Sequence, residues 1–225
     1  MDYRRECGCV NHCGARSAVE YGLVVMIAPS DRFERAIAAF DAANAEDPTP
    51  IDVGGEARPR ELVQAERLSA WMTRLYPEAS EALRLAARCQ HLRRWEIPRK
   101  SYADGRIGYL EWRKELSRFH ARKAAEILRS VGYDDDTIAR VERINKKTSI
   151  KADAEVQAME DALCLAFLDH ELAEFAAEHE DDKIVDIVQK TWRKMSARGH
   201  EEALKLPLTG RAGELVRKAL AAESG

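Results

Sequence analysis

The stretch Glu160-Asp161-Ala162-Leu163-Cys164-Leu165-Ala166-Phe167-Leu168 (residues 160–168) constrains how the rest of the chain can be arranged. Seven apolar residues follow two carboxylates without interruption, so a helix formed here is apolar on nearly every side and is expected to be buried. The surrounding pattern predicts this helix over about residues 154–179. A carboxylate that enters such a helix is costly unless it is paired, hydrogen-bonded or bound to a metal.

The chain from Ser30 onward also has the apolar spacing of helices, and strong helix formers dominate it. The other predicted helices cover about residues 30–44, 59–75, 80–95, 109–130, 134–144, 182–197 and 210–222. Residues 45–59 and 97–108 are rich in Pro and Gly and are expected to be surface loops. We therefore predict an all-α fold, a single-domain helical bundle over residues 30–225, preceded by a disordered extension over residues 1–29.

The composition excludes several classes of protein. The 225 residues include 36 Lys and Arg against 39 Asp and Glu, a net charge of −3, so no bulk basic field exists to hold nucleic acid non-specifically. No apolar run approaches the length of a membrane span, and the N-terminus lacks a secretory layout. Five Cys without regular spacing do not indicate a disulfide framework. We expect a cytoplasmic protein that does not bind membranes.

Asp161 is the first candidate for chemistry because it lies at the entrance of the apolar run. Gln157 lies one turn before it on the same helix face. Two interpretations remain open for Asp161: it is a metal ligand, or it pairs with an Arg or Lys from a neighbouring helix.

His91 and His120 are the other candidates, on two further predicted helices. Each of the three residues lies where its helix changes from apolar to polar. Histidine and carboxylate ligands suit a divalent metal such as Mn, Fe or Zn. The alternative for each histidine is an ordinary packed side chain with one hydrogen bond.

Basic residues surround these three candidates in the sequence. They are Arg93, Arg94, Arg99, Arg113, Lys146 and Lys147. Cations beside a metal suit the oxygens of a phosphoryl group, so an anionic small molecule is the expected partner. Trp95 and Tyr102 lie among the arginines and could bind an aromatic ring or pack the loop. The alternative is that these cations only solvate helix faces.

The chain resembles, over about residues 31–208, a bacterial and fungal family known as domain of unknown function 4202. The phrases that carry this resemblance are Gln90-His91, Arg94-Trp95, Pro98-Arg99, Gly108-Tyr109, Trp112-Arg113, Gln157, Glu160-Asp161, Lys190-Thr191-Trp192 and Lys194-Met195-Ser196. The family implies no established activity.

A more distant resemblance is to the HD phosphohydrolases, which are all-α and hold one or two metals with His and Asp. It implies an HD-like fold in which His91 is the histidine of the His-Asp doublet, Asp161 the final aspartate and His120 an additional ligand. Glu66 falls about where the first histidine of that family belongs. The sequence departs from the family where Leu92 replaces the doublet aspartate.

The function predicted from these features is metal-dependent hydrolysis of a phosphorylated small molecule or nucleotide. His91, His120, Asp161 and Glu66 would hold the metal, and Glu160 would position the attacking water or a ligand. The basic side chains would clamp phosphate oxygens. The alternative is a non-catalytic helical module that binds an anionic ligand or a partner protein through the same basic pocket.

Overall fold

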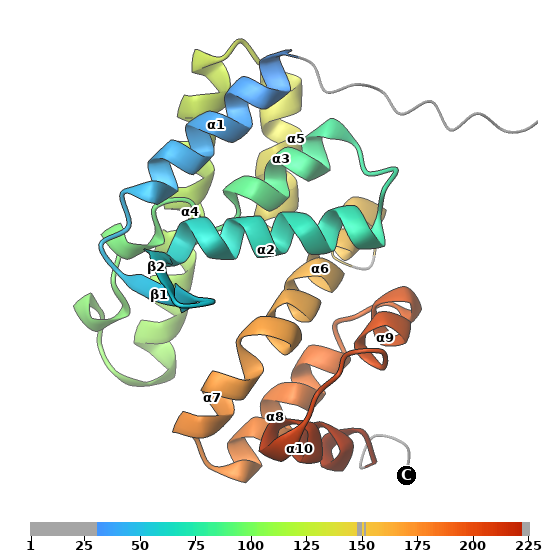
Figure 1. Cartoon of the computed structure of the whole chain (residues 1–225). Coiled ribbons are helices and arrows are strands. Elements are labelled where there is room, and N and C mark those ends of the chain that lie inside the picture. Colours follow the sequence, from blue (N-terminus) through green and yellow to red (C-terminus); the bar gives the residue numbers. More distant parts are fainter. Residues whose placement is uncertain (1–30, 148–149, 151, 222–225) are drawn as a thin grey trace, which may run out of the picture.

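The computed structural model describes residues 31–147, 150 and 152–221. In this part of the chain, helices and one two-stranded hairpin form the structure (Figure 1), so the all-α prediction is confirmed. The elements follow in the order α1 (Asp31–Ala45), β1 (Pro50–Val53), β2 (Glu56–Pro59), α2 (Arg60–Leu75), α3 (Glu81–Cys89), η1 (Arg94–Glu96), η2 (Arg99–Ser101), α4 (Gly105–Ser130), α5 (Asp135–Asn145), α6 (Ala154–His170), α7 (Leu172–Glu178), α8 (Asp181–Trp192), α9 (Ala197–Ala203) and α10 (Gly210–Ala221). The predicted disordered extension lies outside the described residues.

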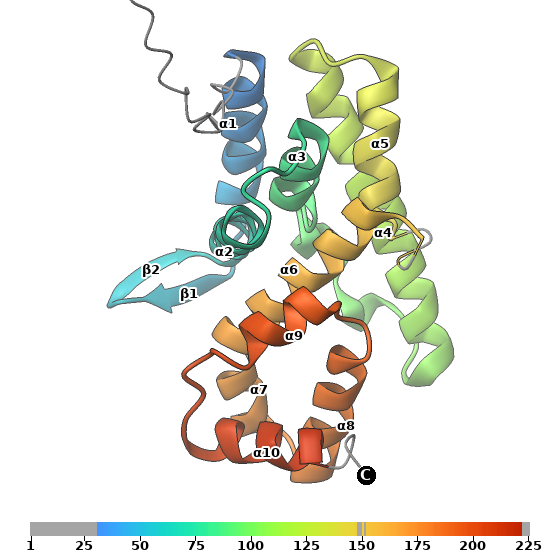
Figure 2. The ribbon, with the colours of Figure 1, turned by 90° about the vertical axis from the view of Figure 1, so that its right-hand side faces the viewer.

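Helix α6 lies at the centre of the molecule, as its apolar sequence requires. It packs on α2, α3 and α5 on one side and on α7 and α9 on the other. Figures 1 and 2 show α6 between a group formed by α1–α5 and a group formed by α7–α10. Leu165 is fully buried, and so are both of the adjacent carboxylates Glu160 and Asp161.

One continuous cluster of buried apolar side chains extends from α1 to α10. Phe40 of α1, Met72 of α2 and Leu85 of α3 belong to it, as does Leu215 of α10. In the described residues, no helix combines the length and apolar character needed to cross a bilayer.

The hairpin β1–β2 replaces the loop that the sequence predicted over residues 45–59. Its strands pair antiparallel, with Val53 opposite Glu56 across a Gly54-Gly55 turn. Both glycines have positive φ, 65° and 91°, which two-residue hairpin turns require and which glycine adopts without strain. Pro and Gly in this segment therefore mark a turn between strands rather than an irregular loop.

Other predicted helices also differ from the structure. The helix predicted over residues 80–95 ends at Cys89, which leaves His91 in a turn, and the helix predicted from residue 109 begins at Gly105.

The helix predicted over residues 154–179 is two helices, α6 and α7, which are separated at Glu171, with φ −119° and ψ −24°. The helix predicted over residues 182–197 ends at Trp192, and Ser196 then caps the short helix α9 by accepting a hydrogen bond from the Gly199 amide.

Replacing Leu165 by Ala should destabilise the protein by about 2–5 kcal/mol, because the change leaves a cavity in the centre of the core. The same change at Leu163, which is only partly buried on the same helix, should cost less. Urea unfolding of both variants measures the difference. Equal losses of stability in the two variants would contradict the central position of α6.

Candidate functional site

His91 and His120 lie side by side. His91 is in the turn that follows α3, and His120 is on α4; their ring centroids are 6.0 Å apart and their planes are tilted by 50°. We refer to these two residues as the histidine pair.

The ring of His120 is held in one tautomer. It is 4% exposed, and its Nδ1 lies 2.7 Å from the backbone carbonyl of Leu92. A carbonyl only accepts, so Nδ1 carries the proton and Nε2 is an unprotonated acceptor. Nε2 is buried and has no hydrogen-bond partner among the described residues. A buried polar atom without a partner is rare and indicates a place for a ligand or water.

Burial lowers the pKa of His120 to about 4; its hydrogen bond to Leu92 opposes this shift, and the charge of Arg94 adds to it. Burial likewise lowers the pKa of His91 well below its usual value, and the charges of Arg94 and Lys147 lower it further. Both rings are therefore neutral at pH 7. The charged side chains that lower the pKa of His91 are the cations Arg94, Lys147 and Arg113.

The turn after α3 brings Arg94 toward the histidine pair. Its guanidinium lies 5.1 Å from the ring centroid of Trp112, and its Nε lies 4.0 Å from Oε1 of Glu61. Burial lowers the pKa of Arg94, although its side chain is still 31% exposed. Trp112 is fixed in turn by donating from Nε1 to the carbonyl of Ile97 at 2.8 Å.

Lys147 is near enough to the histidine pair to lower the pKa of His91, and it forms an ion pair with Glu160. Lys147 Nζ lies 2.9 Å from Oε2 of Glu160, and Lys194 Nζ lies 3.5 Å from Oε1. Burial raises the pKa of Glu160, but the charges of the two lysines outweigh this and hold the pKa below its usual value. Glu160 is thus an ionised counter-ion that fixes the position of Lys147.

The backbone is strained at both edges of this site. Arg93 and Lys147, each with φ 54°, are the non-glycine residues with left-handed backbone in the described part of the chain. Such a conformation costs about 1–3 kcal/mol and persists only where the surroundings hold it. The Arg93 amide donates to Oδ1 of Asn44 at 3.0 Å, which holds the turn that carries His91 and Arg94.

Glu61 is a residue that sequence reasoning missed. It is 6% exposed at the start of α2, and burial raises its pKa to about 7 although Arg94 opposes the shift. Its Oε2 has no hydrogen-bond partner in the described residues. Glu66, which the HD resemblance had favoured, lies away from this group and pairs with Arg58 at 2.8 Å. Nothing in the local sequence distinguishes Glu61 from other glutamates of a first helical turn.

Asp161 has a different role from either of those predicted for it. It is fully buried and accepts hydrogen bonds from the Tyr76 hydroxyl at 2.7 Å and from Nε2 of Gln157 at 3.0 Å. The amide of Ser196 donates to it at 2.7 Å and the hydroxyl of Ser196 at 2.5 Å. Both carboxylate oxygens are therefore occupied by donors of this chain, and none of these donors is an Arg or Lys.

The predicted set of metal ligands does not form one group. No cluster of three or more His, Cys, Asp or Glu side chains that could hold a metal is found among the described residues. The histidine pair is close together, but Asp161 and Glu66 are held by other partners. These side chains do not fit the metal centre that the HD resemblance implies.

The remaining predicted cations are engaged locally. Arg93 pairs with Glu46 at 2.8 Å and lies over Trp95, Arg99 donates to the carbonyl of Tyr102, and Lys146 pairs with Glu142 at 2.6 Å. Of the predicted phosphate-binding set, the structure places Arg94, Arg113 and Lys147 close enough to the histidine pair to lower the pKa of His91.

Residues 34–216 match the family model described as "Domain of unknown function (DUF4202)". The chain belongs to this DUF4202 family. No curated protein and no solved structure matches the chain. The DUF4202 match includes every residue of the histidine pair and of the cations around it.

Replacing Asp161 by Asn should destabilise the protein by about 3 kcal/mol, because an amide would oppose one of the donors that the carboxylate accepts from. Asp186→Asn, which breaks an exposed ion pair with Lys190, makes the same charge change and should cost less than about 1 kcal/mol. Urea unfolding with and without Mn²⁺ measures both. A stabilisation by Mn²⁺ that Asp161→Asn removes would instead identify Asp161 as a metal ligand.

The pKa of His120 near 4 should make stability depend on pH. An unfolded imidazole has a pKa of about 6.5, so between these values the unfolded chain binds more protons than the folded one. We expect stability to be full above about pH 6.5 and to fall as the pH decreases toward 4. His120→Asn should flatten this dependence in urea titrations at pH 5 and 7.5. An unchanged slope would show that His120 does not titrate as its burial requires.

Proposed function

We propose that this DUF4202 protein binds a phosphorylated small molecule at the histidine pair. The observation that carries the proposal is the buried Nε2 of His120, which has no partner among the described residues and lies near the cations Arg94 and Arg113. Cations attract an anion, and an oxyanion can supply the missing hydrogen-bond partner.

The cations differ in how they would hold phosphate oxygens. Arg94 and Arg113 carry planar guanidinium groups, which bind two oxygens at once, whereas Lys147 acts as a point charge. Glu160 holds Lys147 in place without titrating near pH 7, since its pKa lies below the usual range. The left-handed backbone at Lys147 also helps to hold its side chain in this position.

Binding of an anion should bring a proton with it. A phosphate next to Nε2 favours the charged imidazole and raises the pKa of His120 from about 4. The protonated Nε2 then donates to a phosphate oxygen, while Nδ1 continues to donate to Leu92 and keeps the ring oriented. Affinity is therefore expected to rise as the pH falls.

A second candidate function is hydrolysis of the bound phosphate ester. The fixed orientation of His120 favours it, because the protonated Nε2 beside a bound ester can act as a general acid and donate its proton to the leaving-group oxygen. The resemblance of these helices to HD phosphohydrolases is its other support. No step through a metal is proposed, since the ligand set of that family does not fit.

We place the protein in the cytoplasm, as Cys89 and Cys164 are free thiols.

Calorimetric titration with inorganic phosphate and with a phosphate monoester tests the proposal. Arg113→Gln should weaken binding about tenfold or more, because a charge-assisted hydrogen bond is lost. Arg35→Gln is the matched control: Arg35 is exposed on α1, and its ion pair among the described residues is with Asp31 of the same helix. In wild-type protein, affinity for the monoester should increase by up to about tenfold per pH unit as the pH falls from 8 toward 6, the range in which the free ligand, with a second pKa of about 6, is still largely a dianion.

Two results would contradict the proposal: equal weakening by Arg113→Gln and Arg35→Gln, or no proton uptake when the same titration is repeated in buffers of different ionisation enthalpy. Release of phosphate from the monoester that His120→Asn abolishes would identify the protein as a hydrolase. Binding without release would leave the non-catalytic module.

A further inference from the structure

Exposed apolar side chains gather at the N-terminal end of α4. Ile107 is 76% exposed, Leu110 55% and Tyr109 43%, and in the described part of the chain the other large apolar side chain exposed to this degree is Leu204. Figure 2 shows that the first turns of α4 extend past the end of α5, where these side chains are left uncovered. Apolar side chains that are exposed side by side indicate a surface for a partner.

Cations surround Leu110 on the surface of this helix. Residues three and four positions apart on a helix are neighbours, so Leu110 lies beside Arg106, Ile107 and Lys114. Arg106 and Lys114 are exposed, and neither forms an ion pair with another described residue. We refer to Arg106, Ile107, Leu110 and Lys114 as the α4 patch.

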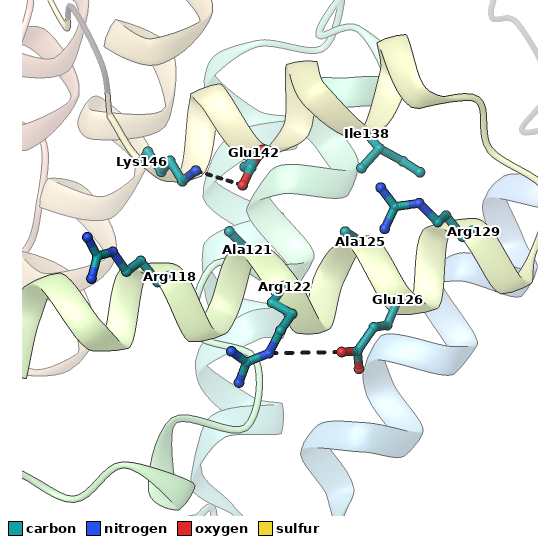
Figure 3. Close-up of a pocket in the computed structure, with 9 residues that line it drawn as sticks. All are labelled: Arg118, Ala121, Arg122, Ala125, Glu126, Arg129, Ile138, Glu142 and Lys146. Carbon is teal, nitrogen blue, oxygen red and sulfur yellow. Dashed lines mark hydrogen bonds and ion pairs between the residues drawn. The ribbon is translucent and has the colours of Figure 1, made fainter.

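Farther along α4 the cations are paired within the chain. Figure 3 shows Arg122 beside Glu126, with 4.0 Å between Nε and Oε1, and Lys146 of α5 beside Glu142, with 2.6 Å between Nζ and Oε1. The cations of the α4 patch lack such partners among the described residues, so their charges remain for an acidic group of another molecule.

The start of α4 is held in place by the loop before it. A Cβ at Gly108 would lie 2.1 Å from the carbonyl oxygen of Ala103, so glycine lets this loop pack directly on the helix. Arg99 donates to the carbonyls of Tyr102 at 3.0 Å and of Ala103 at 2.9 Å. The α4 patch is therefore presented on a fixed helical surface, and a partner that binds it has little to order in this chain.

We propose that the α4 patch binds an acidic segment of another protein in which two carboxylates flank an apolar side chain. Arg106 and Lys114 are eight residues apart with Leu110 midway between them, which corresponds to about 12 Å along a helix. Two carboxylates four residues apart in an extended segment span about 13 Å, and the side chain midway between them lies on the same face. The carboxylates would pair with the two cations, and the apolar side chain would contact Ile107 and Leu110. The inference does not depend on the proposed phosphate site.

Two other occupants fit the α4 patch less well. In a two-fold pairing with a second copy of the chain, Arg106 and Lys114 would face the same cations of that copy, and like charges repel. On an anionic membrane, the patch would insert two apolar side chains beside the exposed carboxylate of Glu111, which is little apolar area for stable binding.

Fluorescence polarisation with labelled synthetic peptides tests the proposal on the full chain. A peptide that contains Glu-Ser-Leu-Ser-Glu should bind. Its affinity should be higher, by about tenfold or more, than that of a peptide in which Ser replaces the Leu and that of a peptide in which Lys replaces both Glu.

The double variant Leu110→Ser with Lys114→Glu should weaken this binding by about tenfold or more, because it removes an apolar contact and reverses a charge. Leu204→Ser with Lys205→Glu is the matched control, since it makes the same changes at an exposed leucine and lysine outside α4, and it should leave binding unchanged. Circular dichroism and thermal unfolding check that both double variants fold.

The inference is overturned if the Glu-Ser-Leu-Ser-Glu peptide does not bind, or if the two double variants weaken binding equally. Sedimentation with vesicles of phosphatidylserine and phosphatidylcholine tests the membrane as the occupant, and vesicle binding that Leu110→Ser with Lys114→Glu abolishes would replace the proposal. Analytical ultracentrifugation tests the second copy in the same way, since a wild-type dimer that this variant makes monomeric would assign the α4 patch to self-association.

Discussion

The buried carboxylate of Asp161 is the interaction on which the arrangement of the helices depends. A carboxylate without partners in this core would cost several kcal/mol. Four hydrogen bonds from Tyr76, Gln157 and Ser196 offset that cost, and they connect the end of α2 and the start of α9 to the centre of α6. Glycine at position 199 makes room for this carboxylate, because a Cβ there would lie 2.9 Å from Oδ1 of Asp161.

The two consecutive carboxylates of α6 have different roles: Asp161 holds helices together, and Glu160 belongs to the candidate site. Successive side chains leave a helix about 100° apart, so Glu160 and Asp161 cannot serve the same group. Asp161 faces α2 and α9, and Glu160 faces Lys147 and Lys194. Because Asp161 holds α6 at a fixed rotation, it also determines where Glu160 places Lys147. The stability of the core and the position of Lys147 near the histidine pair therefore both depend on the same turn of α6.

The sequence predicted what depends on local pattern and missed what depends on tertiary partners. Helical periodicity and the apolar run gave the helices and the burial of α6. The placement of His120 on a helix also follows from that pattern, whereas His91 lies in a turn that the pattern did not predict. The partners of Asp161 could not be predicted, because Tyr76 and Ser196 approach it only through the packing of α2 and α9. Glu61 was missed for the same reason, since its burial depends on the turn that carries Arg94 rather than on its neighbours in α2.

The histidine pair is difficult to explain as a device for stability. His120 leaves a ring nitrogen buried without a partner, and a buried unpaired polar atom costs about 1–3 kcal/mol. The left-handed backbone at Arg93 and Lys147 adds a similar cost at each residue. Several unfavourable free-energy terms at one place are typical of functional sites, where a bound ligand supplies the missing interactions. The proposed anion would have this role at the histidine pair.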